Sequence, residues 1–280
     1  MSNLSARNCR ASLFWGALRL SDFQSLGHTD ADIFCIDLED AVPPSEKDKG
    51  RAALKTFLQS HTPSPNTRYI VRVNECQTRD GDLDLELLIG ESGFVSHLLI
   101  PKLESVSALE KVSELLDRKG SDLGLLGIIE TPLGLEIASA LAASRSRLKG
   151  FYFGGFDLSN SLGCEMDWNA LSYARSRVVH AAALGELLVI DSPPPFVDET
   201  PEKVDLIKYC RTSKSFGMMG MVTKHVSQIS SIQSVFSPSE KEIERARKIL
   251  DMYLSDPSQP IVFEGKLIER PTIKKLQRLI

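Results

Sequence analysis

The stretch Leu125-Leu126-Gly127-Ile128-Ile129-Glu130-Thr131-Pro132 is an apolar run that closes on a carboxylate. A continuous apolar run of this kind predicts a strand that is covered on both faces. A second run, Phe151-Tyr152-Phe153-Gly154-Gly155-Phe156-Asp157-Leu158, closes in the same way on Asp157. Residues at the carboxyl ends of parallel strands lie at the rim where α/β proteins form active sites. Two such carboxylates from neighbouring strands can hold one hard cation, so the two runs predict a metal site.

Similar runs recur along the chain and alternate with longer segments of helical period. This alternation indicates parallel strands joined by crossover helices. Eight runs can be counted, near residues 12–15, 33–39, 69–73, 98–101, 125–130, 151–155, 187–191 and 218–224. Eight strands with helices between them predict an α/β protein with a (β/α)8 barrel, the TIM barrel fold.

The segments 105–119 and 168–184 have apolar residues at spacings of three and four and predict amphipathic helices. After the eighth run, Ser237-Pro238-Ser239-Glu240 predicts a new helix that is capped by Ser237 and reaches about residue 254. A single short strand at 261–263 and a last helix from residue 272 should follow. We therefore expect a catalytic barrel over 1–235 and a carboxyl-terminal helical extension over 236–280, which acts as a lid or arm.

Composition excludes several classes of protein. With 280 residues, 25% of them charged, and a net charge of −4, the chain suits one large domain with an appendage and no nucleic-acid partner. No apolar stretch reaches the ~20 residues that a membrane span needs, and the amino-terminal residues are too polar for a signal peptide. Five scattered cysteines lack zinc-type spacing and are expected to be reduced thiols. These features predict a cytoplasmic protein without a membrane partner.

Acidic and basic residues gather at the predicted carboxyl ends of the strands, where barrel enzymes place their sites. Alternation along the second strand puts Asp37 and Glu39 on one face, toward the barrel interior. Oxygen ligands of this kind favour Mg²⁺, with Mn²⁺ as an alternative, over zinc. Arg72 is the expected counter-charge, and its planar fork suits a substrate carboxylate. An internal salt bridge from Arg72 to Glu39 or Asp37 is the alternative.

Two further features near these strand ends have more than one interpretation. Lys102 follows the fourth strand and suits either substrate binding or a structural role. Gly154-Gly155 lacks the full pattern of a phosphate-binding loop, so a close backbone approach near the metal is the better explanation.

An ordered set of motifs extends from Arg10 to the carboxyl-terminal tail. The motifs are Asp37-Leu38-Glu39-Asp40-Ala41-Val42, Arg72-Val73-Asn74, Pro101-Lys102-Leu103-Glu104, Ile129-Glu130-Thr131, Gly154-Gly155-Phe156-Asp157-Leu158, Phe236-Ser237-Pro238-Ser239 and Gly265-Lys266-Leu267-Ile268-Glu269-Arg270-Pro271. Together they resemble the citrate lyase β-subunit-like family of the HpcH/HpaI aldolases. The resemblance covers nearly the whole chain, and the order of the motifs is more specific than any one of them.

The resemblance implies a Mg²⁺-binding barrel that makes or breaks a carbon–carbon bond between an acyl thioester of coenzyme A and a 2-oxo acid. By position, Glu130 and Asp157 correspond to the metal ligands, and Glu130 is also expected near the substrate. Arg72 corresponds to the arginine that binds the oxo-acid portion. Glu39 and Asp40 match acidic positions that line the site and hold metal-bound water, and both are expected to be catalytic residues.

The same comparison by position implies further roles at the edges of the site. Lys102 and Arg19 are implied to contact the substrate, and Arg10 and Arg19 are implied to contact the coenzyme. Glu269 matches an acidic catalytic residue that is often supplied by the adjacent subunit of a trimer. We therefore expect a homo-oligomer, with a trimer favoured. Family members usually carry Asp at the position of Glu269, so the carboxylate here is on a longer side chain.

The expected reaction is cleavage of a 3-hydroxyacyl-CoA of the citramalyl-CoA or malyl-CoA type. The products would be acetyl-CoA and a 2-oxo acid, pyruvate or glyoxylate. One alternative is the citrate lyase β subunit itself, which acts on a citryl thioester held by an acyl-carrier partner. A second alternative, from another class, is a non-catalytic barrel that binds acyl-CoA and metal. Retention of Glu130, Asp157 and Arg72 argues against the second alternative.

Overall fold

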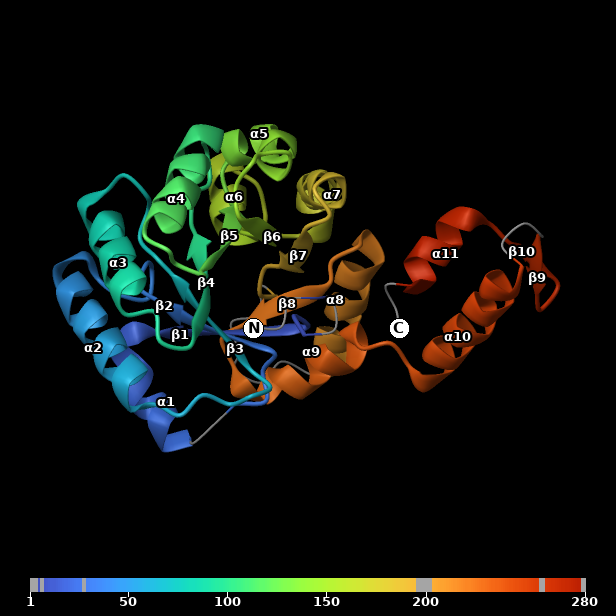
Figure 1. Cartoon of the computed structure of the whole chain (residues 1–280), viewed down its shortest axis with the longest axis horizontal. Helices are drawn as coiled ribbons and strands as arrows, with labels where there is room; N and C mark the ends of the chain where they lie inside the picture. The colour runs from blue at the N-terminus through green and yellow to red at the C-terminus, as the bar shows by residue number, and fades with distance from the viewer. Residues whose placement is uncertain (1–4, 6–7, 27–28, 195–202, 257–259, 278–280) are drawn as a thin grey trace. The chain divides into compact units, whose positions relative to one another are not determined.

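The structure, a computed structural model, describes residues 5, 8–26, 29–194, 203–256 and 260–277. It divides into two compact units, Met1–Phe236 and Ser237–Ile280. In the first unit, eight strands form a closed parallel barrel with helices around it (Figure 1). The predicted (β/α)8 barrel is therefore confirmed.

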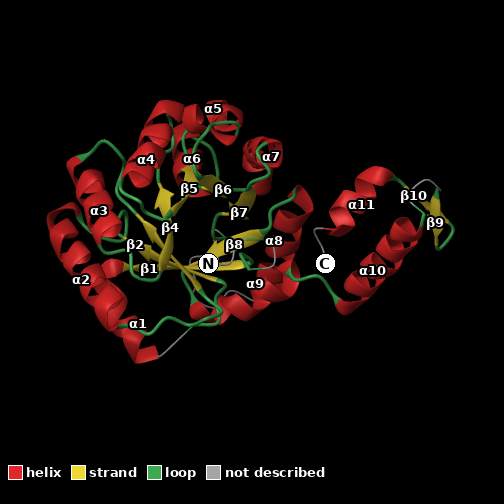
Figure 2. Cartoon of the chain, viewed as in Figure 1, coloured by secondary structure: helices red, strands yellow, loops and turns green. Residues whose placement is uncertain are grey.

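Each of the eight predicted runs corresponds to one strand of the barrel. The strands are β1 (Ala11–Gly16), β2 (Ile33–Asp37), β3 (Arg68–Arg72), β4 (Val95–Ile100), β5 (Gly124–Ile129), β6 (Leu148–Phe153), β7 (Leu188–Asp191) and β8 (Gly220–Thr223). Strands that are consecutive in sequence are neighbours in the barrel, and the pairing of β1 with β8 closes it. Figure 2 shows these strands at the centre of the unit, with the helices outside them.

Helices fill most of the connections between the strands. They are α1 (Leu20–Leu26), α2 (Lys47–Ser60), α3 (Arg79–Gly90), α4 (Val106–Arg118), α5 (Pro132–Ala142), α6 (Gly155–Leu162), α7 (Trp168–Leu184), α8 (Lys203–Phe216) and α9 (Ile229–Phe236), with 3-10 turns at Ala17–Arg19, Pro44–Glu46 and Val226–Gln228. The two predicted amphipathic helices are α4 and α7. Among the helices of the described residues, none combines the length and the apolar character needed to cross a membrane.

Alternation along the strands separates two apolar cores. In β2, Phe34 and Ile36 belong to the core between the barrel and its helices, whereas Ile33 and Cys35 belong to the core inside the barrel. Asp37 follows Cys35 by two positions, so its side chain points inward as predicted, and it is 3% exposed. The strand therefore delivers a buried carboxylate to the barrel interior at its carboxyl end.

The second unit contains α10 (Glu240–Ser255), β9 (Ile261–Phe263), β10 (Lys266–Ile268) and α11 (Arg270–Gln277). The prediction of a single strand is wrong, because β10 pairs with β9 as an antiparallel hairpin. The two residues between them, Glu264-Gly265, both have positive φ, as two-residue hairpin turns require. The last helix starts at Arg270, not at residue 272.

The predicted amino-terminal cap of α10 is wrong by two residues. Ser239 is the cap: its hydroxyl accepts the backbone N–H of Glu242, and the Glu242 carboxylate accepts the backbone N–H of Ser239. Ser237 and Ser239 are each followed three residues later by a glutamate, so both fit the capping-box pattern.

Candidate active site at the carboxyl ends of the strands

A cavity of about 340 Å³ lies at the carboxyl ends of the barrel strands. Its charged lining includes Arg19, Asp37, Asp40, Arg72, Glu130, Asp157 and Lys224. Its apolar lining includes four residues that belong to the core inside the barrel or pack against it, Phe14, Ile128, Tyr152 and Val222, which we call the apolar floor. The cavity therefore combines a charged rim with an apolar floor.

Arg72 is enclosed by carboxylates from one short segment. Asp37 is its register partner on the neighbouring strand, and it accepts hydrogen bonds of 2.7 and 2.6 Å from Arg72 Nε and Nη2. Arg72 Nη1 lies 2.8 Å from Glu39 Oε2 and 3.2 Å from Asp40 Oδ2. We call these four residues the arginine cage. The internal salt bridge weighed as an alternative is present, and Arg72 also lines the cavity.

The arginine cage keeps Arg72 positively charged. Burial disfavours the charged guanidinium, but the hydrogen bonds and charge of Asp37, with the charges of Glu39 and Asp40, raise its pKa overall. The sequence suggested that the planar fork of Arg72 is available to a substrate carboxylate. In the structure its Nε and Nη2 edge donates to Asp37 instead. Arg72 lines the cavity beside Asp40, whose side chain is 64% exposed.

Glu130 follows β5 and is 3% exposed. Its Oε1 accepts the backbone N–H of Lys102 at 2.7 Å. Burial raises the pKa of Glu130 to about 7, and the charges of Glu39 and Asp157 add to the rise, whereas the Lys102 N–H and Arg72 oppose it. A bound cation would offset this excess of negative charge.

Asp157 does not end a strand, as the sequence suggested, but lies in the first turn of α6. The strand β6 ends at Phe153, and Gly154 caps the helix without a side chain. The helix dipole favours an acidic residue in the first turn of a helix, so the presence of Asp157 at this position also has a structural explanation. The side chain is half-buried and lines the same cavity as Glu130. The cavity thus receives one carboxylate after β5 and one from α6.

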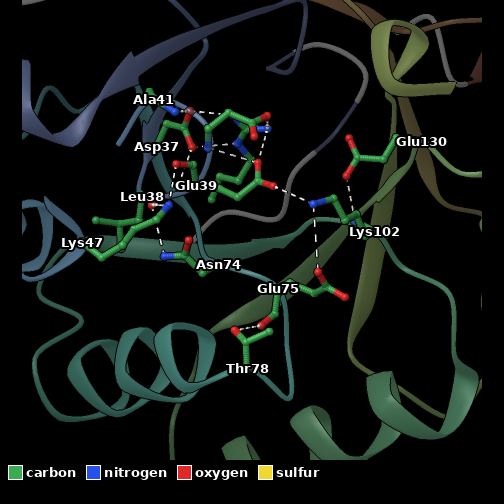
Figure 3. Close-up of polar contacts among 12 residues, drawn as sticks. Asp37, Leu38, Glu39, Ala41, Lys47, Asn74, Glu75, Thr78, Lys102 and Glu130 are labelled. Carbon is green, nitrogen blue, oxygen red and sulfur yellow. Dashed lines mark hydrogen bonds and ion pairs between the residues drawn. The ribbon is translucent and has the colours of Figure 1, made fainter. Parts of the chain in front are cut away.

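Lys102 has a backbone role that the sequence did not indicate. Its N–H binds Glu130, while its Nζ lies 3.6 Å from Glu39 Oε1 and 4.0 Å from Glu75 Oε2 (Figure 3). The residue has φ +46°, and it lines a separate cavity of about 240 Å³. The structure therefore connects Lys102 with the acidic residues, and its contact with a substrate stays a prediction.

The remaining predicted site residues lie in different places. Arg19 is at the rim of the cavity, with its guanidinium 4.7 Å above the ring of Trp15. Arg10 precedes β1 and binds Asp32 at 2.7 Å, so it lies at the amino-terminal end of the barrel, and the structure does not bring it to the cavity. Glu269 is an exposed residue of the second unit, between β10 and α11, and its catalytic role stays a prediction.

One functional contact was missed by the sequence analysis. Lys47 Nζ donates to the backbone oxygens of Leu38 and Glu39 at 2.8 and 2.7 Å, directly behind the arginine cage. The position of Lys47 shortly after the acidic segment 37–40 was the available signal.

The residues present fit Mg²⁺ better than a metal with an all-protein ligand shell. Among the described residues, no group of three or more His, Cys, Asp or Glu side chains is arranged to hold a metal. Mg²⁺ is usually bound through one or two carboxylates, and waters and substrate oxygens complete its six ligands. Glu130 and Asp157, which line the same cavity, are the pair predicted from the sequence.

A barrel with carboxylates and a buried arginine around a cavity at the carboxyl ends of its strands defines a barrel enzyme of the TIM type. The chain belongs to the HpcH/HpaI aldolase/citrate lyase family, which it matches over residues 10–226. This is a family of carbon–carbon lyases, so the chain is an enzyme of that class.

Three similar proteins extend the comparison. A (3S)-malyl-CoA thioesterase of Cereibacter sphaeroides is 33% identical, over 85% of this chain and 82% of its own. An L-malyl-CoA/beta-methylmalyl-CoA lyase of Rhodobacter capsulatus is 25% identical, over 98% of this chain and 94% of its own. The citrate lyase beta subunit of M. tuberculosis, solved with oxaloacetate and magnesium, is 25% identical with a TM-score of 0.68, and the match covers 84% of this chain and all of that one.

Proposed function

We propose that this chain is a Mg²⁺-dependent lyase that cleaves a 3-hydroxyacyl-CoA into acetyl-CoA and a 2-oxo acid. The observation that carries the proposal is that Glu130, Asp157 and the caged Arg72 line one cavity. The relative named as a malyl-CoA lyase supports the class of substrate. The citrate lyase structure with oxaloacetate and magnesium supports a 2-oxo acid and the metal.

The residues have distinct roles in this reaction. Mg²⁺ held by Glu130 and Asp157 would supply a Lewis acid for the substrate oxygens. Arg72, kept charged by its cage, donates to the carboxylate of the oxo-acid portion. Asp40 or Glu269 accepts the hydroxyl proton while the carbon–carbon bond breaks and the carbonyl forms. The electron pair of that bond passes to the acetyl-CoA enolate, which then takes up a proton.

The apolar floor favours one substrate within this class. Citramalyl-CoA carries a methyl group on the carbon that bears the hydroxyl, whereas malyl-CoA carries hydrogen. A methyl group in an apolar pocket contributes about 1–3 kcal/mol to discrimination. Phe14, Ile128, Tyr152 and Val222 offer such a pocket. We therefore propose citramalyl-CoA, which yields pyruvate, as the better substrate and malyl-CoA, which yields glyoxylate, as the poorer one.

A panel of 3-hydroxyacyl-CoA esters tests the proposal. Purified protein should release acetyl-CoA and a 2-oxo acid, with Mg²⁺ or Mn²⁺ required. Glu130→Ala should abolish the metal-dependent rate. Glu269→Ala should lower turnover and leave metal binding intact, which separates a base from a ligand. A metal-dependent rate that survives in Glu130→Ala would refute the assigned ligand.

A second candidate function is hydrolysis of the thioester, favoured by the 33% identity to a malyl-CoA thioesterase. The products distinguish the two reactions. A thioesterase releases a free coenzyme A thiol and the intact hydroxy acid, whereas a lyase releases a 2-oxo acid and no free thiol. Thiol and 2-oxo acid assays on the same reaction decide between them. Dependence on an acyl-carrier partner would instead indicate a citrate lyase β subunit.

We also propose a homotrimer that acts in the cytoplasm, with Arg19 as a contact of the coenzyme. The exposed guanidinium of Arg19 at the cavity rim suits a phosphate group of the coenzyme.

All five cysteines are free thiols, which suits a reducing compartment such as the cytoplasm. Light scattering after gel filtration tests the trimer, and Arg19→Met should raise KM for the coenzyme A ester.

A further inference from the structure

The segment that carries the acids of the arginine cage is held by its backbone carbonyls. Lys47, the first residue of α2, donates from Nζ to the carbonyl of Leu38 at 2.8 Å and to that of Glu39 at 2.7 Å. Figure 3 shows Lys47 next to the segment that carries Asp37 and Glu39. The ammonium of Lys47 thus joins two successive carbonyls of this segment.

A chain of hydrogen bonds also connects α2 with the carbonyl of Leu38. Asn74 Nδ2 donates to the Leu38 oxygen at 3.1 Å and to Asp84 Oδ2 at 2.7 Å. Asp84, which is fully buried on α3, also accepts from Arg51 Nη1 at 2.9 Å. Arg51 lies one helical turn after Lys47, so one face of α2 supports Leu38 both directly and through two intermediates.

This support acts on the part of the cage that lies beyond the end of β2. Asp37 is fixed by its strand and by two hydrogen bonds to Arg72. Glu39 and Asp40 lie beyond the end of β2, and their side chains can meet Arg72 Nη1 only if the loop backbone keeps its course. Asp37 accepts the N–H groups of Glu39 and Ala41. Lys47 adds to this by holding the carbonyls of Leu38 and Glu39. The ammonium of Lys47 also brings positive charge to a segment with three carboxylates.

We propose that Lys47 is a positioning residue that sets the arginine cage for the oxo-acid portion of the substrate. The inference rests on the proposed function, in which Arg72 binds that portion. Loss of Lys47 lets Glu39 and Asp40 move relative to Arg72 while Asp37 stays in place. Glu130 follows β5 and Asp157 lies on α6, so neither belongs to the segment that Lys47 supports. Lys47 therefore affects binding of the oxo acid and not binding of the metal.

Three variants of the full chain test this role. Lys47→Met removes the donors, and Lys47→Arg keeps a charged donor. Lys49→Met is a matched control on the same helix, because Lys49 is exposed and forms a local ion pair with Glu46. Measurements are kcat/KM for citramalyl-CoA, pyruvate binding by calorimetry with saturating Mg²⁺, Mn²⁺ affinity by electron paramagnetic resonance, and the unfolding midpoint.

Lys47→Met should lower kcat/KM by about 10- to 100-fold and weaken pyruvate binding to a similar extent, because outer contacts that orient a site have effects of that size. Its Mn²⁺ affinity should stay within about 2-fold of the unmodified protein, and Lys47→Arg should recover part of the loss. Lys49→Met should match the unmodified protein throughout.

Two results would overturn the inference: unchanged pyruvate binding in Lys47→Met, or a parallel fall in pyruvate binding, Mn²⁺ affinity and unfolding midpoint, which would indicate a purely structural role. Failure of the proposed function is separate. It would appear as a lack of cleavage by the unmodified protein, and pyruvate binding would still test Lys47.

Discussion

Glu130 lies directly against the backbone of Gly154. A Cβ atom built on Gly154 would stand 2.2 Å from the Cβ of Glu130 and 2.8 Å from its Oε2. The Gly154 N–H also donates to the carbonyl of Ile129 at 2.9 Å, which joins the ends of β5 and β6 at this point. The absence of a side chain at position 154 therefore creates the space that the carboxylate occupies. This close approach is the one that the sequence indicated for Gly154-Gly155.

Gly154→Ala should displace the Glu130 carboxylate and weaken metal binding. The backbone at Gly154 has φ −91°, which alanine adopts readily, so the effect arises from the clash alone. We expect Mn²⁺ affinity to fall by about 10-fold or more, as for other changes beside a metal ligand. Calorimetric titration measures it. Gly90→Ala is the control, since a Cβ there meets nothing within 4 Å; equal affinities in the two variants would refute the prediction.

Arg72→Lys should keep the positive charge but lose the planar guanidinium with its several donors. A lysine ammonium cannot make the paired hydrogen bonds with Asp37 and still reach Glu39 and Asp40. We expect kcat/KM to fall by about 100-fold, because small displacements of a binding group have effects of that size. Mn²⁺ affinity should change little. Steady-state kinetics beside a Mn²⁺ titration measure both, and a large loss of metal binding would contradict the assigned role.

The buried pair of Arg175 and Asp191 should be important for stability. Arg175 is 1% exposed and Asp191 is fully buried, with Nε and Oδ1 3.1 Å apart. Removing one partner of such a pair leaves an uncompensated buried charge and costs about 3–5 kcal/mol. Arg175→Met should therefore unfold at much lower urea concentration. The double variant Arg175→Met/Asp191→Leu should recover part of the loss, and a double variant less stable than Arg175→Met would contradict this account.

His97 on β4 should make stability depend on pH. Burial lowers its pKa to about 4, and the charges of Lys149 and Arg68 add to the effect. An unfolded histidine has a pKa of about 6.5, so between these values the unfolded chain binds a proton that the folded chain does not. The stabilisation is therefore complete above pH 6.5 and is lost as the pH falls toward 4.

Urea unfolding at two pH values tests the histidine. From pH 6.5 to 5.0, His97 should account for about 2 kcal/mol of lost stability. His97→Gln should lose less stability over the same interval, since the other titrating groups are common to both proteins. Identical losses would show that His97 does not titrate in this way.

The barrel could be predicted because its strands are buried on both faces and so appear as continuous apolar runs. The second unit, Ser237–Ile280, was harder to predict. Its β10 follows a Glu264-Gly265 turn in place of the more usual Asn-Gly or Asp-Gly, although the glycine was a usable signal. The cap of α10 was ambiguous because Ser237 and Ser239 satisfy the same local rule, and only the folded chain selects one.

Alternation along β2 placed Asp37 correctly, whereas Glu39 lies beyond the end of that strand, and alternation could not show which partner the guanidinium of Arg72 binds. That assignment depends on the register of β2 against β3, which pairs Asp37 with Arg72 and follows from the packing of the whole barrel. The contact of Lys47 is also tertiary, because a lysine that binds carbonyls has the same local sequence as one in solvent. Arg10 precedes β1 and lies at the other end of the barrel from the cavity, so its contact with the coenzyme stays a prediction.

The two halves of the cavity differ in how many parts of the chain build them. The acids that hold Arg72 all come from the segment 37–40, whereas the apolar floor takes one residue from each of β1, β5, β6 and β8. A change in the short segment disturbs several charges at once, but a change in the floor alters one wall of the cavity. Ile128, Tyr152 and Val222 can therefore be changed one at a time to alter the size of the cavity, whereas a change at Phe14, whose ring centroid lies 5.6 Å from the guanidinium carbon of Arg72, also alters the surroundings of the arginine.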